Sequence, residues 1–181
     1  MALKYLIETY GCQMNLHDSE ILAGQLEQMG FEEAGSEEEA DLILINTCTV
    51  RETAAQKVLG ELGRLKTLKA LKPELLIGVC GCMAQEEGRV EQIRRQFPHV
   101  DLIFGTHNLH RLPELVRRAR EEEGMVVDVW KSAGEVVENL PVKRADGVKA
   151  WVTIIYGCDK HCTYCIVPFT RGRERSRRPE D

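Results

Sequence analysis

The chain has 181 residues, 43% of them hydrophobic, and a formal net charge of −5. Glycine and proline are too few for a collagen-like or low-complexity chain, and the length allows one buried core plus an extension. We find neither a secretory signal pattern nor an apolar run long enough to cross a membrane. We therefore expect a cytoplasmic, monomeric protein with no membrane partner.

The charge is unevenly distributed along the chain. Residues 141–181 hold nine Lys/Arg and five Asp/Glu, a balance of +4, whereas the residues before them have a balance of −9. A basic segment favours a phosphate-bearing partner, although a solvated tail has the same count. Two roles stay open for its arginines, contact with RNA phosphates or pairing with acids of a longer protein: Arg171, Arg173, Arg175, Arg177 and Arg178.

Strand-like and helix-like segments alternate over residues 1–130. Strands are expected at residues 3–8, 31–34, 41–45, 75–80, 100–104 and 125–129, and helices at about 17–29, 51–71, 84–96 and 109–123. This alternation predicts an α/β fold with a doubly wound, mostly parallel sheet in flavodoxin-like order. Neither a Walker phosphate loop nor a G-x-G-x-x-G fingerprint is present, so we do not interpret it as a nucleotide-binding domain.

The rest of the chain has a different character. Residues 131–147 are polar and poorly periodic, which predicts a linker, and residues 148–181 predict the start of a second unit with a strand at 149–155. Residues 178–181 resemble the beginning of a helix, with an early proline followed by acids that the helix dipole favours. A chain that ends there is expected to be part of a longer protein.

Three of the seven cysteines lie in one short loop. Cys158, Cys162 and Cys165, hereafter the loop cysteines, are separated by three and then two residues. An odd cysteine count without an export signal favours metal binding over disulfides. Three thiolates hold a [4Fe–4S] cluster with one iron open, which suits the amino and carboxylate groups of S-adenosylmethionine. A zinc site completed by His161 or a distant cysteine is the alternative.

Three further cysteines share one context. Cys12, Cys48 and Cys82, hereafter the edge cysteines, each follow a predicted strand and precede a predicted helix. Those positions meet at the carboxyl edge of an open parallel sheet, where a second three-cysteine cluster would fit. The alternative is that they are small buried hydrophobes, which is how we interpret Cys80 inside its strand.

A few polar residues are weaker candidates. Asn15, Asp18 and Glu20 follow Cys12 and are candidates to shape a pocket there, although capping a helix is the more ordinary role for Asp18. Gln85 is a candidate of the same kind beside Cys82. The five histidines show no paired ligand spacing, so no metal is assigned to them.

Four ordered segments resemble the radical S-adenosylmethionine methylthiotransferases, a resemblance that spans residues 5–181. They are Tyr10-Gly11-Cys12-Gln13-Met14-Asn15, Asn46-Thr47-Cys48-Thr49-Val50-Arg51-Glu52, Gly81-Cys82-Met83-Ala84-Gln85 and the Cys-x-x-x-Cys-x-x-Cys segment within residues 157–172. The resemblance implies two [4Fe–4S] clusters, one on the loop cysteines that binds S-adenosyl-L-methionine and one on the edge cysteines. It also implies that residues 148–181 begin a truncated radical-SAM partial (β/α) barrel.

The resemblance further implies an enzyme, a transferase that acts on tRNA. The expected product carries a methylthio group on carbon 2 of N6-dimethylallyladenosine beside the anticodon, and the expected electron donor is a flavodoxin- or ferredoxin-type reductant. Threonylcarbamoyl-adenosine or a ribosomal-protein aspartate are alternative substrates. A non-catalytic iron–sulfur electron carrier or a zinc-stabilised RNA-binding module is the alternative of another class. Residues 1–181 alone are expected to be inactive.

Overall fold

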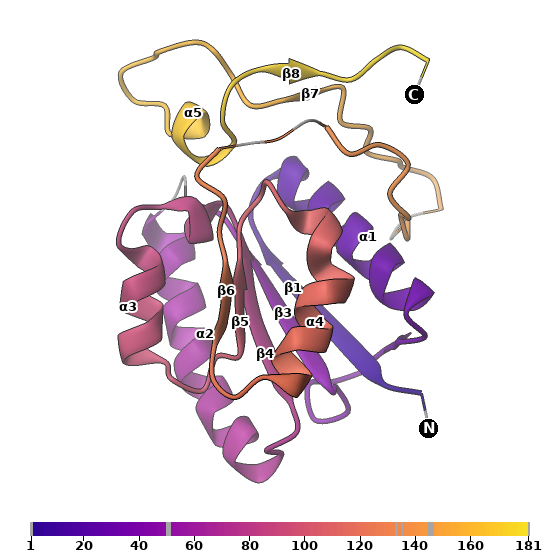
Figure 1. Cartoon of the computed structure of the whole chain (residues 1–181), viewed down its shortest axis with the longest axis vertical. Coiled ribbons are helices and arrows are strands. Elements are labelled where there is room, and N and C mark those ends of the chain that lie inside the picture. Colours follow the sequence, from indigo (N-terminus) through magenta and orange to yellow (C-terminus); the bar gives the residue numbers. More distant parts are fainter. Residues whose placement is uncertain (1, 50–51, 133, 135, 145–146, 181) are drawn as a thin grey trace.

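Six parallel strands form the central sheet of the computed structural model (Figure 1). The structure describes residues 2–49, 52–132, 134, 136–144 and 147–180. Val50, Arg51 and Asp181, which belong to segments discussed above, lie outside the described residues. The sheet order is β2-β1-β3-β4-β5-β6, which confirms the doubly wound, flavodoxin-like prediction. The strands are β1 Lys4–Tyr10, β2 Glu32–Glu33, β3 Leu42–Thr47, β4 Leu76–Gly81, β5 Leu102–Phe104 and β6 Val126–Asp128.

Four helices cover the two faces of this sheet, α1 and α4 on one side and α2 and α3 on the other (Figure 1). Every residue of β3 and of β4 is buried, because parallel strands between two helix layers have no solvent face. Leu22 and Leu26 of α1 pack in one core and Val58 and Leu62 of α2 in the other. The helices are α1 Gln13–Gln28, α2 Glu52–Leu71, α3 Arg89–Gln96 and α4 Leu112–Glu121.

The first helix begins earlier than predicted, and Asp18 does not cap it. Cys12 is the N-cap residue, and its backbone N–H donates to Asn15 Oδ1 at 3.3 Å. Asn15 is the third residue of the helix, so its side chain makes the reciprocal half of a capping box with Cys12. Asp18 instead lies within α1 on its buried face, with 1% of its surface exposed.

Two predicted helices are divided. In place of one helix over residues 84–96, a 3-10 turn η1 Cys82–Gln85 precedes α3, and Gly88 between them has φ of +76°. A left-handed residue cannot continue a right-handed helix, so the chain restarts there. The predicted helix over 109–123 likewise consists of a 3-10 turn η2 Leu109–Arg111 followed by α4, in which Pro113 occupies the first turn.

The C-terminal part lies across the carboxyl edge of the sheet (Figure 1). The strand predicted over residues 149–155 is wrong except for its last residue, because β7 Ile155–Tyr156 pairs antiparallel with β8 Arg175–Ser176. Before it, Val152 is 59% and Ile154 67% exposed, and Ile154 extends the pairing by one bond, since its carbonyl accepts from the Arg177 N–H at 2.9 Å. Between β7 and β8 lies the short helix α5 Val167–Thr170. Within the described residues, this part contains no parallel strand pair of a barrel.

The segment predicted as a linker has no regular secondary structure in its described residues, yet it packs along α1. The backbone N–H of Lys143 donates to the Glu20 carbonyl at 2.9 Å, and its ammonium pairs with Glu27 at 2.6 Å. Gly24 permits this approach, because a Cβ there would lie 2.5 Å from the carbonyl carbon of Pro141. A glycine inside α1 therefore serves contact with the following segment.

We expect Gly24→Ala to lower the free energy of unfolding by about 1–3 kcal/mol, because the added methyl collides with backbone that cannot move cheaply. It should also speed proteolysis within residues 131–147. The control is Gly60→Ala in α2, where a Cβ meets nothing within 4 Å and better helix propensity should add about 0.5–1 kcal/mol. Urea denaturation and limited trypsin digestion measure both, and equal stabilisation of the two variants would contradict this packing.

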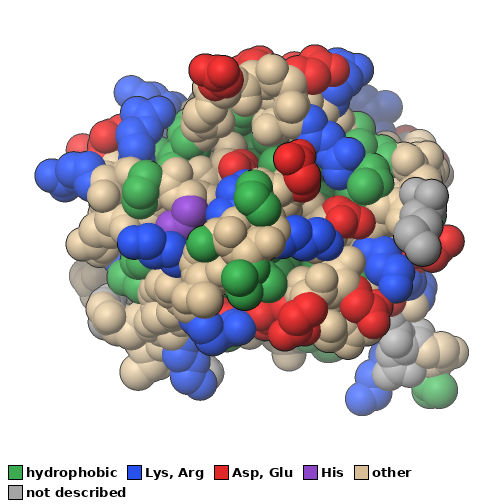
Figure 2. Space-filling model, turned by 90° about the horizontal axis from the view of Figure 1, so that it is seen from below, with side chains coloured by type: hydrophobic (Ala, Val, Ile, Leu, Met, Phe, Trp, Pro, Cys, Tyr) green, Lys and Arg blue, Asp and Glu red, His purple; other side chains and the backbone are tan. Residues whose placement is uncertain are grey.

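The described helices are all too short or too polar to span a bilayer. On the face drawn in Figure 2, acidic and basic side chains are interspersed, without a large area of one sign. Some charges of the basic segment are neutralised within the chain, since Lys143 pairs with Glu27, Arg144 with Glu20 and Arg171 with Asp18. The uneven charge of the sequence is therefore partly compensated by folding.

Candidate metal centres at the carboxyl edge of the sheet

The edge cysteines follow three neighbouring strands at the same end of the sheet. Tyr10 of β1 is in register with Thr47 of β3, and Thr47 with Gly81 of β4. Cys48 and Cys82 come directly after their strands, and Cys12 comes two residues after β1. The carboxyl edge thus gathers three thiols from turns that are far apart in the sequence, as the topology predicted.

These thiols differ in exposure. Cys12 is exposed, whereas Cys48 and Cys82 are each 6% exposed. Cys80 lies inside β4 with no exposed surface, as expected for a core residue, and its burial raises the pKa of its thiol well above the ordinary value. None of the seven cysteines forms a disulfide.

Two buried asparagines hold the first two turns together. Asn15 Nδ2 donates to Asn46 Oδ1 and to the Thr47 carbonyl, both at 3.1 Å, and Asn46 Nδ2 donates to the Asn15 carbonyl at 2.8 Å. The Asn15 carboxamide oxygen also lies 3.5 Å from Cys12 Sγ. Asn15 was a sequence candidate, but Asn46 was missed. Its signal was a polar side chain in an otherwise apolar strand, directly before the Thr47-Cys48 pair.

Glycine is required where the turn at Cys82 meets the turn at Cys48. Gly81 has φ of +92° and ψ of −162°, a region essentially restricted to glycine. A Cβ on Gly81 would lie 2.5 Å from both Asn46 Oδ1 and the Thr47 carbonyl oxygen. Thr47 Oγ1 in turn donates to the Cys80 carbonyl at 2.6 Å. The backbone of β4 can therefore approach β3 closely just before Cys82.

The third feature of this edge is a buried arginine from the C-terminal part. Arg171 is 6% exposed, and its Nε–H donates to Cys82 Sγ at 3.2 Å. One of its terminal nitrogens forms an ion pair of 2.6 Å with Asp18 Oδ2. From the sequence, contact with RNA phosphates and pairing with acids of a longer protein were both left open for Arg171, and this contact was not expected. The available signal was Asp18 itself, an acid at helical spacing from buried Ile21 and Leu22.

Charge stabilises this group of side chains. Burial raises the pKa of the Cys82 thiol, and Arg171 opposes that rise through its charge and its hydrogen bond. Burial also lowers the pKa of Arg171, but Asp18 and Cys82 raise it by more, so the pKa lies above its ordinary value. The guanidinium is thus fully charged. A buried charge is tolerated when an opposite charge and hydrogen-bond partners compensate it, and Asp18 and Cys82 do so here.

The loop cysteines lie between β7 and α5. Cys158 and Cys165 are half-buried and Cys162 is exposed. The base of the loop is closed by the Cys158 N–H, which donates to the Gly172 carbonyl at 3.1 Å. Gly157, with φ of +73°, packs against the carbonyls of Gly172 and Arg173, where a Cβ would not fit. The loop is thus held at its neck while its sulfurs stay accessible.

An open cavity adjoins this loop, with a volume of about 800 Å³ that includes its mouth. Its lining residues are Cys158, Asp159, His161, Pro168, Phe169 and Arg173. His161 therefore borders the cavity together with Cys158. The space is large enough for a drug-sized cofactor.

The neck of this loop is fastened to the sheet edge at two points. Thr106 Oγ1, after β5, donates to the Thr170 carbonyl at 2.8 Å, and Arg171 contacts Cys82 after β4. The Arg171 backbone N–H donates to the Val167 carbonyl, which makes α5 continuous with this attachment. Residues 167–172 therefore connect the loop cysteines to the edge cysteines.

The remaining candidates have structural partners. Gln85 Nε2 donates to the Trp130 carbonyl at 2.9 Å, and Glu20 pairs with Arg144 at 2.7 Å. Of the other arginines, Arg175 donates to the Gly134 carbonyl at 2.8 Å and Arg177 pairs with Glu138 at 2.8 Å. The basic run thus bonds largely to its own chain, and its exposed members are Arg173 and Arg178.

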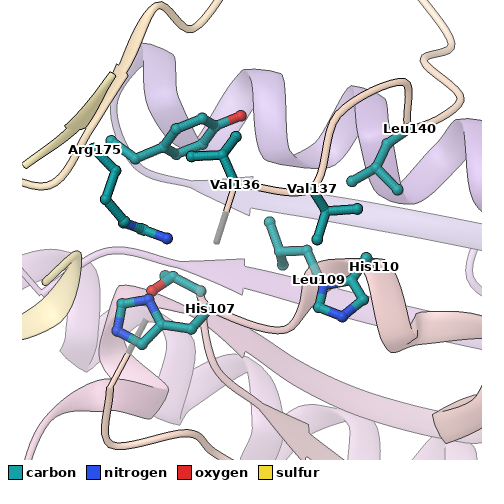
Figure 3. Close-up of a pocket in the computed structure, with 9 residues that line it drawn as sticks. His107, Leu109, His110, Val136, Val137, Leu140 and Arg175 are labelled. Carbon is teal, nitrogen blue, oxygen red and sulfur yellow. The ribbon is translucent and has the colours of Figure 1, made fainter. Parts of the chain in front are cut away.

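A second pocket lies beside this edge, between the loop after β5 and residues 136–140 (Figure 3). His107 and Arg175 face it from opposite sides, and Val136, Val137 and Leu140 make its wall apolar. Burial, with Arg175 and Arg171 nearby, lowers the pKa of His107 to about 4, so the imidazole is neutral at pH 7. The pocket contains no cysteine and lies outside the candidate metal centres.

The chain is similar in sequence to known proteins. Three relatives, all named tRNA-2-methylthio-N(6)-dimethylallyladenosine synthase, come from Halalkalibacterium halodurans, Oceanobacillus iheyensis and Geobacillus kaustophilus. They are 61%, 60% and 60% identical over 178 residues, which are 98% of this chain and 33%, 34% and 34% of the respective relatives. The chain therefore spans about a third of the length of these curated relatives.

A family model covers more than half of the chain. It matches residues 4–105, which contain the three edge cysteines and end before the loop cysteines. The match begins at β1 and ends just after β5, so it corresponds to the sheet whose carboxyl edge is described above. The chain belongs to the family described as uncharacterized protein family UPF0004.

Proposed function

We propose that the full-length protein is a radical S-adenosylmethionine methylthiotransferase that modifies carbon 2 of N6-dimethylallyladenosine beside the anticodon of tRNA. The observation that carries this proposal is the pair of cysteine sets, three thiols at the sheet edge and three in the loop fastened above them. The shared name of the relatives supports the substrate. We place the activity in the cytoplasm, with a flavodoxin- or ferredoxin-type reductant as partner.

The donor atoms fit two iron–sulfur clusters. Cys158, Cys162 and Cys165 would hold a [4Fe–4S] cluster that, when bound, supplies the electron for cleaving the sulfonium of S-adenosylmethionine. Cys12, Cys48 and Cys82 would hold the second cluster. In this proposal, that cluster would carry or supply the sulfur of the methylthio group. Three cysteines from three adjacent turns, none of them in a disulfide, are the donor set that such a cluster requires.

The other residues of the edge would orient these ligands. Asn15 and Asn46 fix the turns of Cys12 and Cys48 against each other. Gly81 lets the Cys82 turn approach Cys48, and the cavity beside Cys158 leaves room for the adenosyl cofactor. Asn15, Asn46 and Gly81 would thus preorganise the edge cysteines on rigid strand ends, so that little ordering is needed when their cluster forms.

The test is mass spectrometry of tRNA nucleosides from a strain that lacks the full-length gene. We expect 2-methylthio-N6-dimethylallyladenosine to disappear and N6-dimethylallyladenosine to accumulate. Expression of the full-length gene should restore the methylthio group, and expression of residues 1–181 should not. If the strain instead loses methylthiolation of threonylcarbamoyl-adenosine, that nucleoside is the substrate. Unchanged tRNA would refute an essential role in tRNA methylthiolation.

Iron content separates the two cysteine sets. In the full-length protein, isolated without oxygen, we expect Cys12→Ala, Cys48→Ala or Cys82→Ala each to remove roughly half of the iron and sulfide, one [4Fe–4S] cluster of two. The matched control is Cys80→Ala, two residues from Cys82 but wholly inside the core. It should keep all of its iron. Equal iron loss in Cys80→Ala and Cys82→Ala, or zinc without sulfide, would contradict the assignment.

A further inference from the structure

Arg171 lies beside the loop cysteines in the sequence, yet it contacts Cys82, which is one of the edge cysteines. The arginine follows α5, six residues after Cys165, at the neck of the loop that carries the loop cysteines. Its Nε–H donates to Cys82 Sγ at 3.2 Å, within the range of a hydrogen bond to sulfur. A residue at the neck of the Cys158 loop is therefore a direct donor to a candidate ligand among the edge cysteines.

Asp18 fixes the direction of this donor. The carboxylate is 1% exposed in α1 and lies 2.6 Å from a terminal nitrogen of Arg171. Because a guanidinium is planar and rigid, holding one terminal nitrogen also sets the direction of Nε. The ion pair and the N–H···S bond therefore act as one unit, buried on both sides.

A charged group in this position has a specific effect on a sulfur ligand. Hydrogen bonds to ligand sulfurs and nearby charges set the reduction potential of an iron–sulfur cluster. A cationic donor stabilises the reduced state, which carries the more negative charge, and so makes the cluster easier to reduce. A surface arginine would have little such effect, because water would screen its charge.

We propose that Arg171 is a positioning residue for both centres, which donates to the Cys82 sulfur when it is a cluster ligand and so holds the neck of the Cys158 loop over the edge cysteines. This rests on the function proposed above. Two contacts hold that neck in place, Thr106 to the Thr170 carbonyl and Arg171 to Cys82, but only the second reaches a ligand sulfur. The inference assigns to Arg171 an electronic role at the second cluster that an ordinary ion pair would not have.

The test uses the full-length protein in which all three loop cysteines are replaced by alanine, so that iron binds only at the edge cysteines. Arg171→Gln and Arg171→Lys are compared with this parent and with Arg178→Gln, an exposed arginine of the same run. Iron and sulfide content reports loading, and a redox titration followed by electron paramagnetic resonance reports the reduction potential. The potential is a readout that a merely structural role would not move once the cluster is loaded.

We expect Arg171→Gln to keep its iron but to become harder to reduce. The ratio of reduced to oxidised cluster at a fixed potential should fall on the order of tenfold, about 59 mV for a one-electron couple. Arg178→Gln should match the parent. Arg171→Lys keeps a positive charge for Asp18 but lacks the Nε donor, so its potential should lie between those of the parent and of Arg171→Gln.

The outcomes distinguish the inference from the function on which it rests. A loaded Arg171→Gln or Arg171→Lys variant with the parent's potential would overturn the inference and leave the proposed function intact. If Arg171→Gln fails to fold, the result for Arg171→Lys decides. A folded parent that holds no iron and sulfide at the edge cysteines would overturn the proposed second cluster itself.

Discussion

Replacing Asp18 by alanine is expected to lower the free energy of unfolding of this chain by about 3–5 kcal/mol, because it leaves the guanidinium of Arg171 buried without its carboxylate. Asp18 is 1% and Arg171 6% exposed, so water cannot replace the lost partner. The loss should exceed that of any surface ion pair of the chain, for which about 0–1 kcal/mol is usual. Urea denaturation followed by circular dichroism measures it.

Two further variants sharpen this result. Glu91→Ala removes an acid that pairs with Arg94 on the exposed face of α3, where the Glu91 side chain is 61% exposed, and should change little. The double variant Asp18→Leu with Arg171→Met removes both charges together and should recover much of the stability that Asp18→Ala loses. Equal costs for Asp18→Ala and Glu91→Ala would mean that Arg171 reaches water after all.

The central sheet was predictable because its strands carry a signal that does not depend on distant residues. Continuous apolar runs at β3 and β4 are buried on both faces, and their alternation with amphipathic helices requires a parallel order. The edge cysteines follow from the same logic, since Cys48 and Cys82 come directly after these two runs and Cys12 comes after the neighbouring β1. Parallel topology alone places such residues at a common edge, whatever the loops between them do.

The features that the sequence did not predict have a common physical cause, which is contact between residues distant in the sequence. Nothing in the local pattern of Arg171 indicates burial, because its partners Asp18 and Cys82 come from two other turns. The strand predicted over 149–155 failed for a related reason, since an apolar run becomes a strand only where a neighbour pairs with it. The start of α1 was missed because a cysteine, with help from Asn15, occupies the cap position.

The turn before Cys82 depends on one glycine, and Gly81→Ala is expected to destabilise the chain by more than about 3 kcal/mol. The backbone region of Gly81 costs a non-glycine residue about 1–3 kcal/mol by itself. The collision of the new methyl with Asn46 Oδ1 and with the Thr47 carbonyl, each 2.5 Å from the Cβ position, adds a steric cost of similar size. Thermal and urea denaturation measure the sum.

Gly88→Ala provides the matched control, seven residues further along the same connection. Gly88 also has a positive φ, +76°, but a Cβ there would meet nothing within 4 Å. Its substitution should cost only about 1–2 kcal/mol, the strain of a left-handed residue without any collision. Similar costs for the two variants would show that the backbone angle matters and the approach of β4 to β3 does not.

The same pair of variants connects stability to the proposed metal centre. Because the methyl of Gly81→Ala pushes the Cys82 turn away from Thr47 and Asn46, the distance between the sulfurs of Cys82 and Cys48 should increase. We therefore expect full-length Gly81→Ala to lose about half of its iron and sulfide, the share of one [4Fe–4S] cluster of two, while Gly88→Ala keeps it. Full iron content in a folded Gly81→Ala protein would mean that the edge cysteines tolerate a displaced turn, and that their close approach is not what a cluster needs.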